Sequence, residues 1–295
     1  MNKHFLAFAI TILATGGALA QANDTLAKIK SSGKAVMGVR DSSSPLSYTL
    51  GDGKYTGYHV ELCERFIKAV APAAKVEYLP VTSQNRIPLV QNGTVDLECG
   101  STTNNATRQK DVSFAVTTFV TEVRTAVKAN SGITSVSQLG GKNVATTTRT
   151  TSVQTLRKHE RANGVDFKEV FGKDHSDSLL LLESGRAEAF VMDDNILAGL
   201  IANAKNPADF RIVGEVLSVE PIAIMFRKDD AAMKKAIDDF ITSQMKSGEL
   251  EKLYTKWFTS PIPPKNTNVN LAMGSTLKSL LAAPNDKPME DYAKK

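Results

Sequence analysis

Short apolar runs rich in β-forming residues alternate with amphipathic segments along most of this chain, and this alternation limits the possible folds more than any other feature. The runs at 34–39, 76–81 and 94–100 are typical of strands, and residues 57–70 repeat apolar side chains at helical spacing. Strands that alternate with helices favour parallel strands joined by crossover helices. The sequence therefore predicts an α/β fold with mostly parallel strands.

A second series of the same kind occupies about residues 141–204. Strand-like segments at 121–129 and 219–227 flank it, which predicts two lobes between which the chain crosses twice. A cleft between two such lobes is a natural ligand site. The elements predicted from 141 onward are strands at 143–146, 167–171, 187–193 and 221–226 and helices at 152–161, 176–184, 195–204, 230–247 and 249–258.

Three further predictions concern the ends of elements. Ser83 is expected to cap a short helix that ends at Asn92-Gly93, because Ser favours the N-cap position and Asn-Gly favours the end of a helix. Residues 113–119 are predicted to form a loop. The residues after Pro261 begin with the proline-rich IPPK and become polar, so they are expected to form an extension rather than part of the core.

The N-terminal stretch MNKHFLAFAITILATGGALA begins with a basic residue, Lys3, and continues with an apolar run. Ala18 and Ala20 then occupy the -3 and -1 positions of a cleavage before Gln21. The apolar run is shorter than the ~20 residues that a membrane-spanning helix needs. The pattern predicts a signal peptide at 1–20, removed on export.

Charge and motif content argue against several classes of function. The net charge of +5 is spread along the chain without a basic block, which argues against nucleic-acid binding. No close pair of histidines and no Cys-x-x-Cys is present, which argues against zinc. There is also no Gly-x-Ser-x-Gly and no glycine-rich phosphate loop.

The only two cysteines, Cys63 and Cys99, can pair in one way in an exported protein. Cys63 lies in a predicted helix and Cys99 ends a predicted strand. Because the sequence gives no distance between them, the presence of a disulfide stays open at this point.

Arginines and hydroxyl residues gather near the ends of the first-series strands. An arginine presents a planar fork that matches a carboxylate, and the carboxyl ends of strands form the ligand-binding edge of open α/β sheets. This arrangement favours an anion site; the alternatives are solvated arginines beside capping loops and an Arg40–Asp41 pair. The residues concerned are Arg40, Ser83, Arg86, Ser101, Thr103 and Arg108, with Asn104 or Asn105 as the cap of the helix that carries Arg108.

The second series places similar residues at its junctions. The run TTTRTTSV at 146–153 lies between a strand and a helix, where hydroxyls and free N–H groups suit a carboxylate or simply cap the helix. His175 lies at a strand-to-helix junction, where surface histidines are common. Asp193 ends a strand, and Asp194 is the expected cap of the following helix.

The chain resembles the extracytoplasmic solute-binding proteins (family 3) of polar amino-acid ABC importers, in particular the glutamate/aspartate branch. The resemblance covers nearly the whole predicted mature chain. It rests on TSQNRIPLVQNGTVDLECGSTTNNATRQK, KDHSDSLLLLESGRAEAFVMDD and WFTSPIPPKN.

The resemblance implies the type II periplasmic binding-protein fold, with two α/β lobes joined by two hinge strands. It also implies a periplasmic monomer without cofactor, metal or catalytic residues, which delivers L-glutamate or L-aspartate to a membrane permease driven by a cytoplasmic ATPase. The implied limits are 23–127 and 220–266 for the first lobe, 128–219 for the second and 267–295 for a C-terminal extension.

The resemblance also implies roles for the candidate residues. Arg108 would clamp the ligand α-carboxylate and Asp193 would face its ammonium group. Arg40 and Arg86 would face the side-chain carboxylate, and the three arginines with Asp193 leave a positive balance that favours an acidic ligand. The remaining candidates are Ser101 and Thr103 around the α-groups, Ser83 and His175 beside the side-chain carboxylate, and Thr147, Thr150 and Thr151 near the α-carboxylate.

Two other functions stay open. One is an arogenate-type dehydratase acting on cyclohexadienyl carboxylates, with His175 or Glu98 as proton donor, and the other is a binder that presents its ligand to a sensor. The chain also departs from the family at two places. Arg149 stands where relatives often have glycine, which either reshapes the loop or adds a cation to the site. Relatives pair the cysteine at the position of Cys99 with a second cysteine in the returning strand. In this chain that strand, PIAIMF, contains no cysteine.

Overall fold

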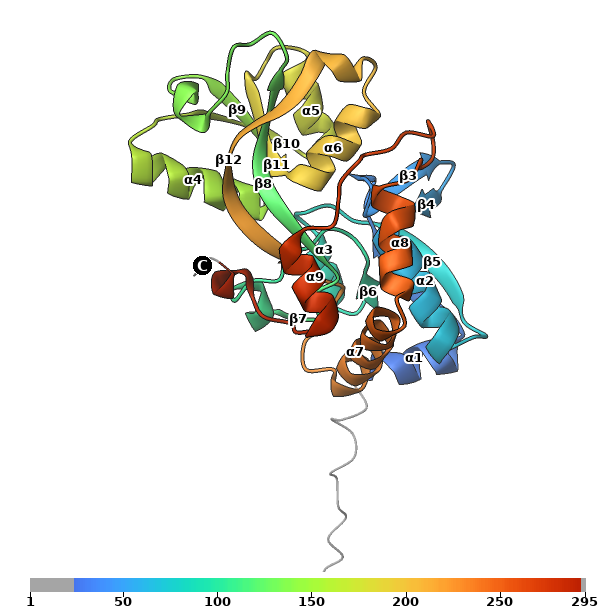
Figure 1. Cartoon of the computed structure of the whole chain (residues 1–295). Coiled ribbons are helices and arrows are strands. Elements are labelled where there is room, and N and C mark those ends of the chain that lie inside the picture. Colours follow the sequence, from blue (N-terminus) through green and yellow to red (C-terminus); the bar gives the residue numbers. More distant parts are fainter. Residues whose placement is uncertain (1–23, 293–295) are drawn as a thin grey trace, which may run out of the picture.

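The computed structural model describes residues 24–292, so the predicted signal peptide at 1–20 lies outside the described residues. The described chain forms two α/β lobes, one above the other in Figure 1, each built around its own five-stranded sheet. The two-lobed α/β fold predicted from the sequence is confirmed.

The first lobe contains a sheet in the strand order β5-β1-β6-β13-β7. β1 pairs in parallel with β5 and β6, whereas β13 runs antiparallel to β6 and β7. A small antiparallel sheet, β2-β3-β4, follows β1. The elements are α1 (Thr25–Ser32), β1 (Lys34–Val39), β2 (Ser42–Ser43), β3 (Ser47–Gly51), β4 (Lys54–Thr56), α2 (Tyr58–Val70), β5 (Lys75–Pro80), α3 (Arg86–Gln91), β6 (Leu97–Glu98), β7 (Val112–Phe114), β13 (Met225–Arg227), α7 (Ala231–Lys246), α8 (Glu249–Phe258) and α9 (Ser275–Ala282).

The second lobe contains a sheet in the order β10-β9-β11-β8-β12. Its first three strands are parallel, and β8 runs antiparallel to both of its neighbours. The elements are β8 (Phe119–Lys128), β9 (Asn143–Thr147), α4 (Thr151–Asn163), β10 (Lys168–Gly172), α5 (His175–Glu183), β11 (Ala189–Asp193), α6 (Asp194–Ala202) and β12 (Phe210–Ile222).

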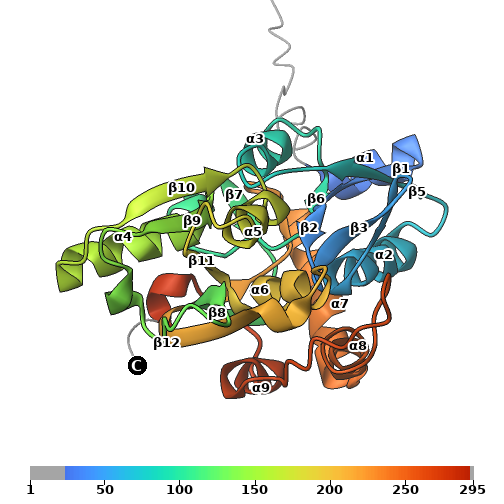
Figure 2. The same ribbon diagram turned by 90° about the horizontal axis from the view of Figure 1, so that it is seen from above.

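The long strands β8 and β12 connect the two lobes. They pair with each other from Phe119–Ile222 at one end to Lys128–Phe210 at the other. In Figure 1 both ribbons run from one lobe into the other, and Figure 2 shows α5 and α6 of the second lobe next to β2 of the first. Residues 123–127, which the predicted limits assign to the first lobe, pair with β11 of the second sheet.

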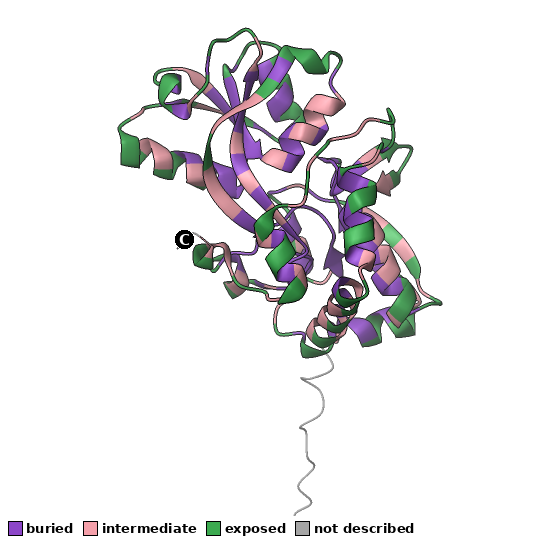
Figure 3. Cartoon of the chain, viewed as in Figure 1, coloured by how far each residue is buried: buried purple, intermediate pink, exposed green. Residues whose placement is uncertain are grey.

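Each lobe has its own apolar core, which explains why each series of strands and helices forms a unit. In the first lobe the ring of Phe258 stacks on Phe119 and Tyr254 at centroid distances of 4.7 and 4.4 Å. The second lobe has separate clusters on the two faces of its sheet. Figure 3 shows buried residues along the strands and exposed residues on the outer helix faces.

Two predictions made from local composition are wrong. The predicted loop at 113–119 includes most of β7, because the buried Phe114 pairs with Met225 in the sheet. The tail after Pro261 is not merely an extension, since α9 buries Leu277 and Leu280 in the first-lobe core. A short amphipathic helix in a polar tail gives too weak a signal to be recognised locally.

A disulfide joins Cys63 in α2 to Cys99, which directly follows β6, and it settles the question that the sequence left open. Both residues are fully buried in the first-lobe core. The bond therefore ties α2 to the strand end that carries Ser101 two residues later.

Removal of this bond is expected to lower the free energy of unfolding by about 2–4 kcal/mol, because the 36-residue separation restricts the unfolded chain. Urea unfolding of wild type and of a Cys63→Ala/Cys99→Ala variant, each with and without reductant, measures the loss. Reductant should shift the wild-type midpoint and leave the double variant unchanged. Equal midpoints for all four samples would contradict a stabilising role.

Candidate functional site

A small, partly open cavity lies between the lobes. Eight of its nine lining residues were named as candidates from the sequence; the ninth, Met192, lies in the buried strand β11 and carried no recognisable signal. The first lobe contributes Ser83, Arg86, Ser101 and Thr103, and the second contributes Thr150, Thr151, His175, Met192 and Asp193.

The carboxyl ends of the strands bring these residues together, as expected for an α/β sheet. Ser101 and Thr103 follow β6, and Asp193 is the last residue of β11. A Cβ atom at position 100 would force the buried Glu98 and Arg40 side chains to shift, so glycine suits this position. The Gly100 carbonyl is held by the buried imidazole of His59 at 2.6 Å, and burial lowers the His59 pKa to about 4.

Arg108 is buried and bonded to the lining residue Thr103, although it is not itself among the nine lining residues. Its Nη1 donates to the Thr103 carbonyl at 2.8 Å, and its backbone N–H donates to Asn105 Oδ1 at 2.8 Å. Neither candidate cap occupies the N-cap position of the short 3-10 helix Arg108–Lys110, which is Thr107, so that prediction is wrong. Asn104 Nδ2 instead donates to the Asp286 carbonyl. Burial lowers the pKa of Arg108, and Glu220 opposes this shift.

Arg86 is a buried cation that faces the cavity with unused donors. Neither its Nε nor its Nη1 has a hydrogen-bond partner among the described residues. Burial, followed by the charge of Arg108, lowers the Arg86 pKa to about 9, which still leaves the group charged at neutral pH. An unsatisfied buried cation is costly, so its position at the cavity wall indicates an anion site.

Ser83 does not cap α3, contrary to the prediction. Asn85 occupies the N-cap position of that helix. The Ser83 hydroxyl is buried, lines the cavity and has no hydrogen-bond partner among residues 24–292. It is therefore a second group beside Arg86 with free hydrogen-bonding capacity.

Arg40 is fully buried and does not line the cavity; its two Nη atoms are paired, whereas its Nε has no hydrogen-bond partner among the described residues. Its Nη2 donates to Asp174 Oδ1 at 2.6 Å, and Nη1 lies 3.4 Å from Ser101 Oγ. The Arg40–Asp41 pair considered from the sequence is wrong, because Asp41 accepts a hydrogen bond from Tyr55 instead. Local spacing favoured Asp41, whereas the closure of the lobes selects Asp174.

The second-lobe hydroxyls divide into those at the cavity and one behind it. Thr147 Oγ1 lies 2.9 Å from His175 Nδ1 and supports the imidazole from behind. Thr150 donates to the Thr147 carbonyl at 2.7 Å, so it fixes the turn and still lines the cavity. Burial and the charge of Arg40 lower the His175 pKa to about 3, which keeps the ring neutral.

Asp193, not Asp194, occupies the N-cap position of α6, so the predicted cap is wrong. Asp194 Oδ1 instead accepts from Thr121 Oγ1 at 2.7 Å, which links α6 to β8. Burial and the nearby charges of Glu220 and Asp194 raise the pKa of Asp193 well above its usual value. A cation in the cavity would favour the ionised form of Asp193.

The sequence reasoning missed Glu220, a fully buried residue of β12. Its Oε2 accepts from Thr103 Oγ1 at 2.6 Å and from Thr151 Oγ1 at 2.7 Å. It therefore joins hydroxyls from both walls of the cavity. The available signal was an acidic residue directly before the apolar run PIAIMF.

Glu98 is also fully buried, and its Oε2 accepts from Thr102 at 2.6 Å. The three arginines are thus surrounded by four carboxylates, so the positive balance predicted from the sequence is wrong. The unpartnered Nε and Nη1 donors of Arg86 are still available to an anion, although these buried groups together carry no excess of positive charge. The four acidic residues are Glu98, Asp174, Asp193 and Glu220.

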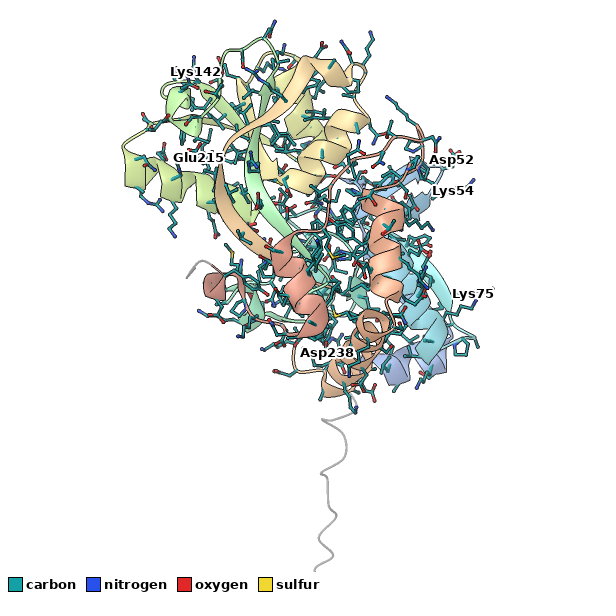
Figure 4. The ribbon with its side chains drawn as sticks, viewed as in Figure 1. Asp52, Lys54, Lys75, Lys142, Glu215 and Asp238 are labelled. Carbon is teal, nitrogen blue, oxygen red and sulfur yellow. A yellow bond between two sulfur atoms is a disulfide. The ribbon has the colours of Figure 1, made fainter. Side chains whose placement is uncertain are left out.

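The structure shows which of the two expected effects Arg149 has in the threonine run at 146–153. Its backbone has φ of 61°, a left-handed conformation that glycine adopts without cost, and its side chain is exposed. Arg149 adds no cation to the cavity. Figure 4 shows several other charged side chains at the periphery of the lobes, among them Asp52, Lys75 and Lys142.

Within residues 24–292, no helix is long and apolar enough to cross a membrane. The same residues contain no group of three or more His, Cys, Asp or Glu side chains placed to hold a metal ion.

A family model for bacterial extracellular solute-binding proteins, family 3, matches residues 35–260. The chain is 48% identical over 273 residues to the L-glutamate/L-aspartate-binding protein of Pseudomonas aeruginosa, with 90% of each chain covered. It is 44% identical over 295 residues to the glutamate/aspartate import solute-binding protein of Escherichia coli, with 96% of this chain and 98% of that one covered. Among solved structures it is similar to an ancestral amino acid-binding protein described as a precursor of cyclohexadienyl dehydratase, with a TM-score of 0.71, 26% identity and coverage of 79% and 99%.

Proposed function

The chain belongs to the bacterial extracellular solute-binding proteins, family 3, and from this premise we propose that it captures L-glutamate or L-aspartate between its lobes. The observation that carries the proposal is Arg86, a buried cation with free donors in a cavity whose opposite wall offers Asp193. A dicarboxylic amino acid supplies an anion for the first and a cation for the second. The relatives named for glutamate and aspartate support this ligand class.

In the proposed complex, Arg108 and the residues around Thr103 hold the α-carboxylate, with Thr150 and Thr151 on the other wall. The ammonium group faces Asp193 and Ser101. The side-chain carboxylate lies against Arg86, Ser83 and His175, and Arg40 with Thr147 supports this end from behind. Each charge-assisted hydrogen bond contributes about 1.5–3 kcal/mol, and several together offset the desolvation of the ligand.

We further propose that β8 and β12 act as the hinge and that the loaded protein delivers its ligand in the periplasm to an ABC permease. The limits of the lobes then fall within these two strands, since β8 already pairs with β11 from Val123 onward. Hinge closure on a ligand is the motion expected of two lobes joined by two strands.

The proposed function involves no catalysis, and the relatives named above are binding proteins for glutamate and aspartate. The dehydratase alternative requires a proton donor at the ligand. His175 is neutral, with its pKa lowered to about 3, and the Glu98 carboxylate does not line the cavity. Neither residue is arranged as a general acid. A role in presenting the ligand to a sensor would use the same site.

Calorimetric titration of unfolded and refolded, ligand-free protein with glutamate, aspartate and glutamine tests the proposal. We expect tight binding of both acids and glutamine binding at least about a hundredfold weaker, because an amide leaves Arg86 without an anion. Glutamine affinity within tenfold of glutamate, a difference of only about 1.4 kcal/mol, would contradict the assigned role of Arg86. No heat with either acid would refute the ligand class.

A further inference from the structure

We propose that Asp174 is a latch that holds the two lobes closed and thereby sets how slowly the ligand leaves. This inference rests on the proposed ligand-binding function but assigns Asp174 a separate role. Asp174 does not line the cavity, so it would act as a positioning residue without touching the ligand.

The carboxylate of Asp174 bridges the cleft with both oxygens. Asp174 lies in the second lobe, between β10 and α5, yet Oδ1 accepts from Arg40 Nη2 at 2.6 Å and Oδ2 accepts from Ser42 Oγ at 2.7 Å. Arg40 and Ser42 both belong to the first lobe, directly after β1. Ser42 Oγ in turn accepts from the backbone N–H of Ser176 at 3.3 Å. The contact therefore depends on the two lobes being closed.

The Asp174 side chain contacts the first lobe instead of capping its own helix, α5. It occupies the N-cap position of α5, where an aspartate side chain normally accepts a hydrogen bond from the start of its own helix. No such capping bond is formed, because the carboxylate turns toward the first lobe. The capping bond typically contributes about 1 kcal/mol, so the cross-lobe contacts must outweigh it in the closed form.

The pair is strong because water is largely excluded from it. The Arg40 side chain is fully buried and that of Asp174 is only 16% exposed. Burial by itself would raise the Asp174 pKa, but the charge of Arg40 and the hydrogen bonds from Ser42 and Arg40 lower it to about 2. Asp174 is therefore ionised across the neutral range, and opening the lobes separates two opposite charges.

The latch also connects directly to the walls of the cavity. Arg40 Nη2 lies 3.3 Å from His175 Nε2, and Arg40 Nη1 lies 3.4 Å from Ser101 Oγ. When Asp174 fixes the guanidinium, it also fixes one cavity residue from each lobe. Loss of the latch should therefore speed opening and release while leaving the encounter of ligand with the open form nearly unchanged.

The test compares Asp174→Asn with a matched control, Glu169→Gln, which removes the Arg157–Glu169 ion pair within the second lobe. Stopped-flow measurements should show that Asp174→Asn speeds dissociation by about tenfold to a hundredfold for glutamate and aspartate alike, with less than a threefold change in association rate. Ser42→Ala should show a smaller effect in the same direction, and the control should match wild type. Unchanged dissociation in Asp174→Asn, or an equal change in the control, would overturn the latch.

A measurement of closure without ligand tests the latch independently of which ligand the protein binds. Dyes attached through cysteines at Lys54 and Lys142, which lie in different lobes (Figure 4), report closure by single-molecule energy transfer. Asp174→Asn should reduce the closed fraction of the ligand-free protein at least tenfold relative to the control. An unchanged closed fraction would overturn the latch whichever ligand the protein binds.

Discussion

Replacement of Arg108 by methionine is expected to weaken the binding of glutamate and aspartate by about a thousandfold or more. Truncation of one partner of a buried, hydrogen-bonded charge pair costs about 2–5 kcal/mol, and about 4 kcal/mol corresponds to a thousandfold. Arg108 is buried, and its guanidinium is anchored to the Thr103 carbonyl at 2.8 Å. Methionine retains the length of the side chain but none of the donors.

Calorimetry with both acids and with glutamine measures this effect, and all three ligands should lose affinity because all carry an α-carboxylate. Arg157→Met is the matched control, since Arg157 is an exposed arginine paired with Glu169, and neither residue lines the cavity. The control should bind as wild type does. An Arg108→Met affinity within tenfold of wild type, in a protein with a normal unfolding temperature, would remove Arg108 from the proposed site.

Replacement of Arg86 by methionine is expected to reduce glutamate affinity about a thousandfold while leaving glutamine affinity nearly unchanged. Only a dicarboxylic ligand uses the free Nε and Nη1 donors of Arg86, so only such a ligand loses a charge-assisted contact. The variant should therefore lose its preference for acids over amides. The same titrations as for Arg108→Met show whether the two arginines act on different ends of the ligand.

A second readout applies to Arg86→Met in the absence of ligand. Burial lowers the pKa of Arg86 because the charged form is poorly solvated there. Replacing this unpartnered buried cation by an apolar side chain of similar length should leave the unfolding temperature unchanged or raise it. A marked fall in unfolding temperature, or equal losses for glutamate and glutamine, would show that Arg86 is a structural residue rather than a selective one.

The sequence predicted much of the cavity because the relevant rule is local. Ser101, Thr103 and Asp193 follow or end predicted strands, and a residue at the carboxyl end of a strand lies at the binding edge wherever the strand is placed. This rule and the family resemblance together named eight of the nine lining residues in advance. The local caps were predicted less well: Ser83 and Asp194 both form other contacts, because a capping preference of about 1 kcal/mol is easily outweighed by tertiary contacts.

By itself the sequence determined that the chain forms α/β units in two lobes, since the alternation of strand and helix patterns favours parallel strands with crossover helices. Only the tertiary structure decided which groups meet. Arg40 pairs with Asp174 across 134 positions of sequence, and Glu220 reaches Thr103 across 117. The Cys63–Cys99 bond and the packing of α9 also depend on how distant segments are brought together. Periodicity and propensity describe how each segment buries its own apolar face, whereas the pairing of charges across a cleft depends on the relative position of the two lobes.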